Sequence, residues 1–576
     1  MSAQQPPADD CFFVRAQTLS EYITLCLENH AEHRFLAELG GRSVTYRETA
    51  EQITILGQAL KRAGIRPGDR VALLGLNSIH WGIAFLTLVT HGAVAVPILT
   101  EFHPTAIHNI INMSGAKAIF VAASLVEKIE GGTFPDLERA FLLEDYHELD
   151  LRHLPEIVKQ LRQRVGEWRE RAEQFLAEHK LPFGKVEHTP QPGDLAAIVY
   201  TSGTTGYSKG VMLTQQNLVS DVVAAVRYVD LGPADRFLSL LPMAHTYECT
   251  CGFLACMHSG SSVTFLHQKP SPKVLQEAFA AVHPTIVFAV PLIIEKIFRK
   301  KVQPRIQSKL LLRTMTRLPL LRRVVYRKAV EGLLQAFGGQ VKFMGLGGAP
   351  LASDVERFLR IGGFPYAIGY GMTECAPLIT GSRVEHTRAG SCGTPVAGIE
   401  LRIADPDPST GVGEVQVRGP MVTQGYYRNP EATAALFTAD GFLRTGDLGV
   451  QDADGFLYLK GRSKNLILGP SGENIYPEEI EHLLTRSPSV VECLVVKRET
   501  GLVALIYPDY DLLTRELHLH GLSDPQIQAR LGEHFKGLLA EVNTQLAAYS
   551  RLSGFRLLDK EFDKTPTEKI KRHLYE

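Results

Sequence analysis

The chain of 576 residues lacks the features that mark several common classes of protein. Its eight cysteines form no CxxC pair, so they do not resemble a thiol-rich metal site, and they fit a reducing compartment. The formal net charge is −1, which argues against a general affinity for nucleic acid. Residues 1–10 contain no cationic segment followed by an apolar one, so no signal peptide is predicted. No internal repeat or low-complexity tract is found.

A long uninterrupted apolar run is also missing. The most apolar long stretch, Trp81–Leu99, is interrupted by threonine, histidine, glycine and proline. Its length would allow a membrane span, but the interruptions favour a buried helix that runs into a strand. We therefore expect a soluble protein located in the cytoplasm. The apolar run that holds Cys249, Cys251 and Cys256 favours small buried thiols over a metal site.

Helical stretches alternate with short apolar runs through the first two thirds of the chain. Runs such as 71–75, 118–122, 237–241 and 286–290 are typical of buried strands, and the residues between them have helical periodicity. This alternation predicts an α/β fold with parallel sheets whose faces are covered by helices. After Cys392 the pattern changes to strands and turns, with hairpin signals at Asp440-Gly441 and Asp454-Gly455. A compact α+β unit of about 110 residues is expected after a boundary at 461–464.

The most informative stretch is 196–210, which reads AAIVYTSGTTGYSKG. A β-branched apolar run leads into a loop of hydroxyls and glycines, followed by the cation Lys209, and Thr214 is a plausible N-cap for a following helix. Small residues let backbone N–H groups approach a polyphosphate, hydroxyls donate to its oxygens, and a lysine offsets its charge. A flexible linker is the alternative, although linkers seldom follow a hydrophobic strand.

A Walker A loop is excluded because that motif ends in Gly-Lys-Ser/Thr, whereas Lys209 lies between Ser208 and Gly210. The stretch resembles the phosphate-binding loop of the adenylate-forming superfamily, which includes acyl-CoA synthetases, firefly luciferases and peptide-synthetase adenylation domains. That family usually has proline where this chain has Ser208. The difference removes a turn constraint but keeps the groups that would face phosphate.

Further stretches resemble the same family, in the same order. Gly347-Gly348-Ala349-Pro350 resembles the segment beside the adenine, and 369–374, GYGMTE, matches the motif that supplies an aromatic, a hydroxyl and a carboxylate to the nucleotide. Thr445-Gly446-Asp447 offers a carboxylate for the ribose hydroxyls, as dinucleotide folds also do. Each of these motifs, taken alone, is equally typical of a tight turn or a helix cap. Their order makes coincidence a poor explanation.

The C-terminal third continues the likeness. Gly461-Arg462-Ser463-Lys464 resembles a ribose-binding arginine followed by a hinge, and 471–479, SGENIYPEE, resembles the segment that lines the pantetheine passage. In 564–572, KTPTEKIKR, Lys569 occupies the position of the family's catalytic lysine, with Glu568 where glycine is usual. His245 aligns with a family motif at the substrate carboxylate, although a single histidine beside an apolar run is more often structural.

The resemblance implies a large N-terminal domain, 1–461, built of doubly wound α/β sheets and a β-rich barrel-like part. It also implies a small mobile α+β domain, 462–576, with a hinge near Lys464. The implied cofactors are ATP and Mg²⁺, with coenzyme A as co-substrate. Implied catalytic residues are Lys569, Thr373, Glu374 and His245, with Glu374 as the metal ligand. Nucleotide-binding residues would be Thr201, Ser202, Gly203, Thr204, Thr205, Lys209, Gly348, Ala349, Pro350, Gly369, Tyr370, Gly371, Thr373, Asp447, Arg462 and Lys569, and CoA-binding residues Gly472 and Glu473.

The implied reaction is activation of a carboxylic acid to an acyl-adenylate, then transfer to coenzyme A. The stretches 458–465 and 472–477 look most like those of bacterial long-chain fatty acyl-CoA synthetases. Transfer to an acyl carrier protein and ligation of medium-chain or aryl acids are the enzymatic alternatives. A fatty-acid-binding or transport adaptor that has lost catalysis is the non-enzymatic one.

Segment 296–328 holds twelve Lys or Arg residues and no acid. Leucines lie between these cations, and the segment has two main interpretations. It forms a solvated cationic helical face, or it makes a peripheral contact with anionic lipid at the inner face of a membrane. Nucleic acid is a weaker third reading because aromatic side chains for base stacking are nearly absent.

Overall fold

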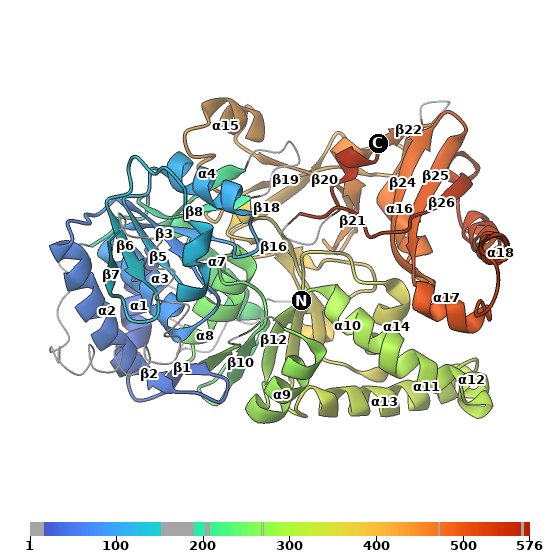
Figure 1. Cartoon of the computed structure of the whole chain (residues 1–576), viewed down its shortest axis with the longest axis horizontal. Coiled ribbons are helices and arrows are strands. Elements are labelled where there is room, and N and C mark those ends of the chain that lie inside the picture. The colour runs from blue at the N-terminus through green and yellow to red at the C-terminus, as the bar shows by residue number, and fades with distance from the viewer. Residues whose placement is uncertain are drawn as a thin grey trace.

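The computed structural model describes residues 16–150, 189–201, 208–266, 268, 270–469, 473–565 and 570–576. Two seven-stranded, mostly parallel sheets form the larger part of the molecule (Figure 1). The first runs in the order β14-β13-β12-β10-β11-β1-β2 and the second in the order β7-β6-β5-β3-β4-β8-β9. In each, antiparallel pairing is confined to outer strands: β1–β2, β6–β7 and β8–β9.

The bounds of the first sheet are β1 Arg34–Glu38, β2 Ser43–Thr45, β10 Arg236–Ser239, β11 Ser262–Phe265, β12 Ile286–Ala289, β13 Phe343–Leu346 and β14 Tyr366–Ile368. Those of the second are β3 Arg70–Leu74, β4 Val94–Ile98, β5 Ala118–Val121, β6 Arg139–Leu142, β7 Glu148–Leu149, β8 Leu195–Thr201 and β9 Lys209–Thr214. The helices around them are α1 Leu19–Asn29, α2 Tyr46–Arg62, α3 Ile79–His91, α4 Pro104–Ser114, α7 Gln215–Ala225, α8 Ala255–Met257, α9 Pro272–Val282 and α14 Ser353–Gly362.

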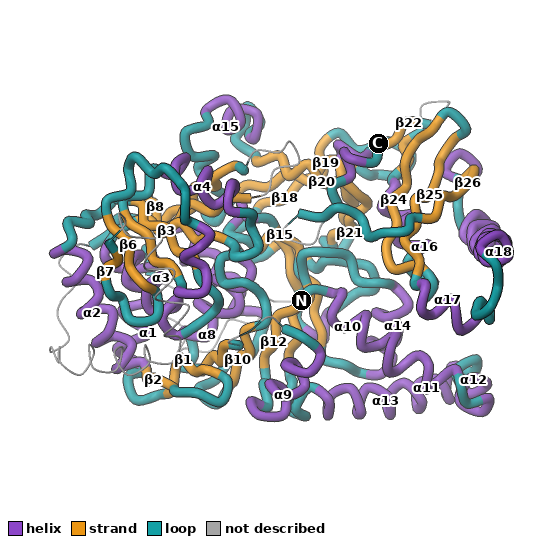
Figure 2. The backbone as a smooth tube through the Cα atoms, viewed as in Figure 1, coloured by secondary structure: helices purple, strands orange, loops and turns teal. Residues whose placement is uncertain are grey.

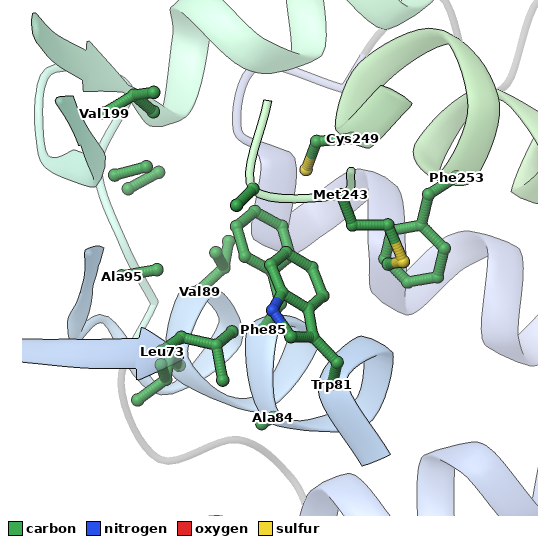
Figure 3. Packing of buried hydrophobic residues seen from close by; sticks show 14 of the residues in the cluster. Leu73, Trp81, Ala84, Phe85, Val89, Ala95, Val199, Met243, Cys249 and Phe253 are labelled. Atoms are coloured by element: carbon green, nitrogen blue, oxygen red, sulfur yellow. The ribbon is translucent and has the colours of Figure 1, made fainter. Parts of the chain in front are cut away.

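The apolar stretch at 81–99 is a buried helix followed by a strand, as predicted. Helix α3 is buried along nearly its whole length and leads through Gly92 into β4. Figure 3 shows Trp81 and Phe85 of this helix packed among side chains from several elements, including Met243 and Cys249. In the part of the chain that is described, no helix combines the length and apolarity needed to cross a bilayer.

Some local predictions need correction. The apolar and β-branched pattern of residues 44–47 predicts a strand, but β2 ends at Thr45, because Thr45 and Glu48 form a capping box that starts α2 at Tyr46. Thr214 does cap a helix, α7, where its side chain accepts from the Asn217 N–H. However, strand β9 lies between the glycine-rich loop and that helix, so the loop joins a hairpin rather than leading straight into a helix. Residues 151–179, whose charged sequence predicts a helix, lie outside the described residues.

The β-rich part after β14 consists of two antiparallel sheets, β15-β16-β17 and β18-β19-β20-β21. Their bounds are β15 Tyr370–Gly371, β16 Leu378–Gly381, β17 Thr394–Pro395, β18 Glu400–Ala404, β19 Gly413–Arg418, β20 Leu443–Gln451 and β21 Leu457–Arg462, with helix α15 at Pro430–Leu436. Both predicted hairpin signals are confirmed: Asp454-Gly455 joins β20 to β21, and Asp440-Gly441 turns between the paired Phe437 and Leu443.

The C-terminal α+β part places β24, β25 and β26 together at one side of the molecule, away from the strands of the larger sheets (Figure 2). Its elements are β22 Ile467–Leu468, β23 Asn474–Ile475, α16 Pro477–Leu484, β24 Val490–Arg498, β25 Gly501–Pro508, α17 Tyr510–Glu516, α18 Asp524–Thr544 and β26 Leu552–Leu557. Helix α16 begins with Pro477 and two glutamates, as its sequence predicts.

Segment 296–328 is helical, as expected. It comprises the end of α10 (Pro291–Ile297), a π-helical turn at Phe298–Val302, α11 (Gln303–Gln307), α12 (Leu310–Met315) and the first half of α13 (Pro319–Ala336). These helices follow one edge of the molecule, with α12 at its corner (Figure 1).

Candidate nucleotide-binding site

The candidate site lies where parallel strands end. Thr201 is the last residue of β8, Gly348 follows β13, and Gly369 follows β14. The N–H of Gly369 donates to the carbonyl of Leu346 at 3.0 Å, so these last two segments leave the sheet side by side. Carboxyl ends of parallel strands are the usual place for a ligand in open α/β sheets.

The hairpin of β8 and β9 places Thr201 opposite Lys209. The Lys209 ammonium lies over the ring of Tyr426, 4.8 Å from its centre. The Tyr426 hydroxyl donates to Oε1 of Glu374 at 2.7 Å. Tyr426 therefore joins the predicted phosphate-binding lysine to the predicted metal-binding carboxylate, which lie 165 residues apart in the sequence.

Backbone pairing holds Tyr426 in this place. Val211 and Tyr426 form an antiparallel bridge, and the Tyr427 N–H donates to the Gly210 carbonyl at 2.8 Å. The N–H of Thr423 donates to the carbonyl of Glu374 at 2.8 Å. A single segment, 423–427, thus fixes β9 against the turn that carries Thr373 and Glu374. Sequence reasoning missed Tyr426; the signal was a pair of tyrosines after a glycine, just before the Asn429 cap of α15.

A second group gathers around Asp447. Its Oδ2 accepts from the Tyr370 hydroxyl at 2.7 Å, and its Oδ1 lies 3.0 Å from Nε of Arg462. Asp447 and Arg462 are directly paired on β20 and β21, which explains their meeting. Tyr370 and Asp447 are buried, whereas the Arg462 side chain is 52% exposed. The arginine can therefore reach a ligand on the open side.

Burial raises the pKa of both tyrosines above its ordinary value, and the neighbouring carboxylates add to this effect. Tyr370 and Tyr426 therefore stay protonated near neutral pH and donate to Asp447 and Glu374. Each carboxylate keeps a fixed orientation as a result.

The glycines of this region allow close approach of backbone segments. A Cβ on Gly371 would overlap the carbonyl oxygen of Pro377, and one on Gly347 would come within 3.2 Å of the Tyr247 ring. Gly348 adopts a φ of +84°, a conformation that favours glycine. Gly348, Ala349 and Pro350 are exposed, which leaves this turn accessible to a flat ligand.

His245 lies immediately before the π-helix Tyr247–Leu254, where its Nδ1 accepts from the N–H of Tyr247 at 3.2 Å. The same helix meets the β15–β16 connection, since the Thr250 hydroxyl donates to the carbonyl of Ala376 at 2.8 Å. A small apolar pocket lies beside Ala244 and Thr246, the two neighbours of His245; its cavity volume is about 10 Å³, enough for about one water molecule. Its lining residues include Phe85, Val199, Met243 and Cys249, which are labelled in Figure 3.

Other predicted residues lie apart from these groups or outside the described part. Lys464 is exposed in the turn Ser463–Asn465, directly after β21. Glu473 is half-buried at the β22–β23 turn, where its carbonyl accepts from the N–H of Gly469 at 2.8 Å. Outside the described residues lie Ser202, Gly203, Thr204, Thr205, Gly472 and Lys569.

Comparison with known proteins decides the family. The model of the AMP-binding enzyme family matches residues 26–427. The chain belongs to the AMP-binding enzyme family. Among curated proteins, the peroxisomal long chain acyl-CoA synthetase 7 of Arabidopsis thaliana is 29% identical, over 96% of this chain and 84% of the relative. Long-chain-fatty-acid–CoA ligase FadD15 of Mycobacterium tuberculosis is 30% identical, over 92% of this chain and 90% of the relative.

Solved structures agree on the fold. The anthranilate CoA ligase AuaEII, in complex with anthranoyl-AMP, superposes with a TM-score of 0.75 at 21% identity, covering 97% of this chain and 96% of that one. O-succinylbenzoate coenzyme A synthetase of Bacillus subtilis, in complex with ATP and magnesium ion, gives 0.70 at 22% identity, covering 96% and 98%. The predicted α/β fold and membership of the adenylate-forming superfamily are confirmed.

Proposed function

We propose that this AMP-binding enzyme is an acid–thiol ligase that uses ATP to join a long-chain fatty acid to coenzyme A. The products would be acyl-CoA, AMP and pyrophosphate. The curated relatives named as long-chain acyl-CoA synthetases support this substrate class, because they align over more than nine tenths of the chain.

The observation that carries the proposal is the pair of linked groups, Lys209–Tyr426–Glu374 and Tyr370–Asp447–Arg462, at one edge of the parallel strands. In the first half-reaction an anionic carboxylate must attack the α-phosphorus of a polyanion. Lys209, the hydroxyls of the glycine-rich loop and Lys569 would offset the charge that builds up on the phosphates. Asp447 and Arg462 would hold the ribose, and Tyr370 with 348–350 would flank the adenine.

Mg²⁺ fits this site through Glu374. Magnesium uses oxygen ligands and often takes only one or two protein carboxylates, with phosphate oxygens completing its shell. The Glu374 carboxylate is largely buried and oriented by Tyr426. Within the described residues there is no cluster of three His, Cys, Asp or Glu that could bind a metal without substrate. When bound, the ion would neutralise charge on the phosphate oxygens.

In the second half-reaction the thiol of coenzyme A would attack the acyl-adenylate and release AMP. We infer that residues 462–576 form a mobile domain that turns about Lys464 between the two steps, and that Gly472 and Glu473 contact coenzyme A. The buried core supports such a division. The apolar cluster of the C-terminal part runs from Ile475 to Leu552, whereas the buried residues of the two large clusters end at Leu457 and Ile368. The exposed turn that holds Lys464 lies between them.

The test is release of pyrophosphate by the purified chain across acids from acetate to oleate, with several aryl acids included. Coenzyme A and an acyl carrier protein are then compared as acceptors. The proposal predicts the highest kcat/KM with long-chain acids and thioester formation on coenzyme A. A preference for aryl or short acids, transfer to the carrier protein only, or no pyrophosphate with any acid would contradict it.

We also propose that the chain contacts the inner face of a membrane from the cytoplasm through segment 296–328, where a fatty acid would be dissolved. Ten of the twelve cations are exposed, and only Arg299 and Lys328 form ion pairs with described residues. Six of the twelve exposed large hydrophobic side chains among the described residues also lie here: Leu310, Leu311, Leu318, Leu320, Leu321 and Val324. Leu310 and Leu320 are 78% and 84% exposed.

Exposed leucines among unpaired cations fit an anionic bilayer better than water or nucleic acid. The cations would meet lipid headgroups, each adding about 1 kcal/mol, while the leucines enter the acyl boundary. Sedimentation with phosphatidylglycerol vesicles tests this. Replacing Arg313, Arg317 and Arg323 with Glu should reduce binding strongly, whereas replacing the exposed Lys536, Arg551 and Arg556 should not. Equal losses in the two triple variants, or no binding by the native chain, would contradict the contact.

A further inference from the structure

The described residues on either side of Lys569 pair with each other and form a common base. Lys564 and Ile570 pair as an isolated antiparallel bridge. One step outward, the N–H of Lys571 donates to the carbonyl of Asp563 at 2.8 Å. The described residues that precede and follow Lys569 are therefore held side by side in the C-terminal part.

One side of this base is held by Glu492. Nζ of Lys564 lies 2.5 Å from Oε1 of Glu492 on β24 and 3.2 Å from Oε2 of Glu561. The Lys564 and Glu492 side chains are each only 19% exposed, so solvent screens their attraction less than it screens Glu561, which is 61% exposed. Glu492 is therefore the stronger anchor of the two.

The other side is held by Glu481. Nη2 of Arg572 donates to Oε1 of Glu481 on α16 at 2.6 Å, and Nη1 donates to the carbonyl of Val495 at 2.9 Å. The same carboxylate accepts from the N–H of Val495 at 2.7 Å. The Arg572 and Glu481 side chains are 13% and 15% exposed. The two charges thus face each other where solvent is largely excluded, and loss of either would leave the other poorly solvated.

The chain end beyond Arg572 is fastened as well. The Tyr575 ring packs edge-on against Phe562, with centres 5.0 Å apart, and its hydroxyl accepts from the N–H of Asp563 at 2.8 Å. Phe562 is itself buried against Leu494, Val496 and Leu505 of the sheet. Apolar packing thus holds the chain end in addition to the two charged anchors.

We propose that Glu481 and Glu492 are positioning residues that fix the paired residues on either side of Lys569, so that this lysine meets the phosphates in the adenylation half-reaction. This inference rests on the proposed function, in which Lys569 is the catalytic lysine. Both glutamates act through Lys569 and touch no substrate. Their loss should therefore affect adenylation and spare thioester formation, in which that lysine has no part.

The variants are Glu481→Gln and Glu492→Gln, which keep the side-chain shape and remove the charge. Glu541→Gln, on the exposed side of α18, is the matched control. We expect each anchor variant to lower kcat for acid-dependent pyrophosphate release about ten-fold or more, as for a lost charged hydrogen bond, with KM for ATP little changed. Thioester formation from supplied acyl-adenylate should stay within about two-fold of the native rate, as for the control.

A charge-exchange double variant tests the proposal even where a single variant folds poorly. Exchanging the pair, Lys564→Glu with Glu492→Lys, should restore much of the adenylation that Glu492→Gln loses. A parallel fall in both half-reactions that follows the unfolding temperature, or unchanged adenylation in both Gln variants, would overturn the inference. The Lys569→Ala variant distinguishes a failure of the proposed anchors from a failure of the proposed function. If that variant loses adenylation while both Gln variants keep it, only the anchors are wrong; if the native chain releases no pyrophosphate, the proposed function fails and this inference with it.

Discussion

Replacing Tyr426 with Phe tests the link between the lysine and the carboxylate in the candidate site. The change keeps the ring beneath Lys209, 4.8 Å from its ammonium, and removes only the hydroxyl that donates to Glu374 at 2.7 Å. A hydrogen bond to a charged group contributes about 1.5–3 kcal/mol. If the orientation that Tyr426 gives to the Glu374 carboxylate is needed only in the transition state, kcat for pyrophosphate release should fall by roughly 10- to 100-fold.

The assay is oleate-dependent pyrophosphate release at saturating ATP. Tyr427→Phe is the matched control, because the neighbouring Tyr427 is half-buried and its ring contacts Arg428, which Phe preserves. The Mg²⁺ concentration for half-maximal rate should rise in the Tyr426 variant alone, since Glu374 is the proposed metal ligand. Equal rates for Tyr426→Phe and the native chain, or equal losses in both variants, would refute the reasoning.

Three further predictions concern the ribose group, the hinge and a buried acid. Asp447→Asn should raise the Kd of AMP about ten-fold or more by calorimetry, because Tyr370 and Arg462 lose a charged partner; an unchanged Kd would remove the ribose role. Lys464→Pro should spare adenylation and slow thioester formation, as measured in separate half-reaction assays; normal thioester formation would exclude a hinge there. Burial raises the pKa of Glu248 from 4.5 to about 8, so between these pH values the folded chain keeps a proton that the unfolded chain releases, and the native chain loses stability as pH rises from about 4.5 to 8. Relative to the native chain, Glu248→Gln should therefore gain roughly 1.4 kcal/mol of unfolding free energy per pH unit across that range, and a pH-independent difference in urea unfolding would contradict the shift.

The sequence predicted the fold where local signals and packing agree. Apolar runs of four or five residues became the buried strands β3, β5, β10 and β12, because each is covered on both faces. The Thr214 cap and the Pro477 start of α16 needed only neighbouring residues. Buried Cys249, Cys251 and Cys256 likewise followed from their apolar surroundings.

The omissions arose where distant segments pair. Strand β9 was missed because its identity depends on pairing with β8, and the glycine-rich loop alone is equally compatible with a helix start. Tyr426 could not be found by periodicity, since its position is set by backbone pairing of segment 423–427 with residues distant in the sequence, such as Gly210 and Val211. The order of motifs predicted that Asp447 and Arg462 belong to one site, but only the β20–β21 register shows why they touch.

Exchange of labelled pyrophosphate into ATP, with oleate present and coenzyme A absent, tests the central claim most directly. That claim is that the groups around Glu374 and Asp447 form one site for acyl-adenylate formation. We expect exchange by the native chain that requires the acid and falls at least about ten-fold in Glu374→Gln. No exchange with any fatty acid, or exchange that is unchanged in Glu374→Gln, would contradict it.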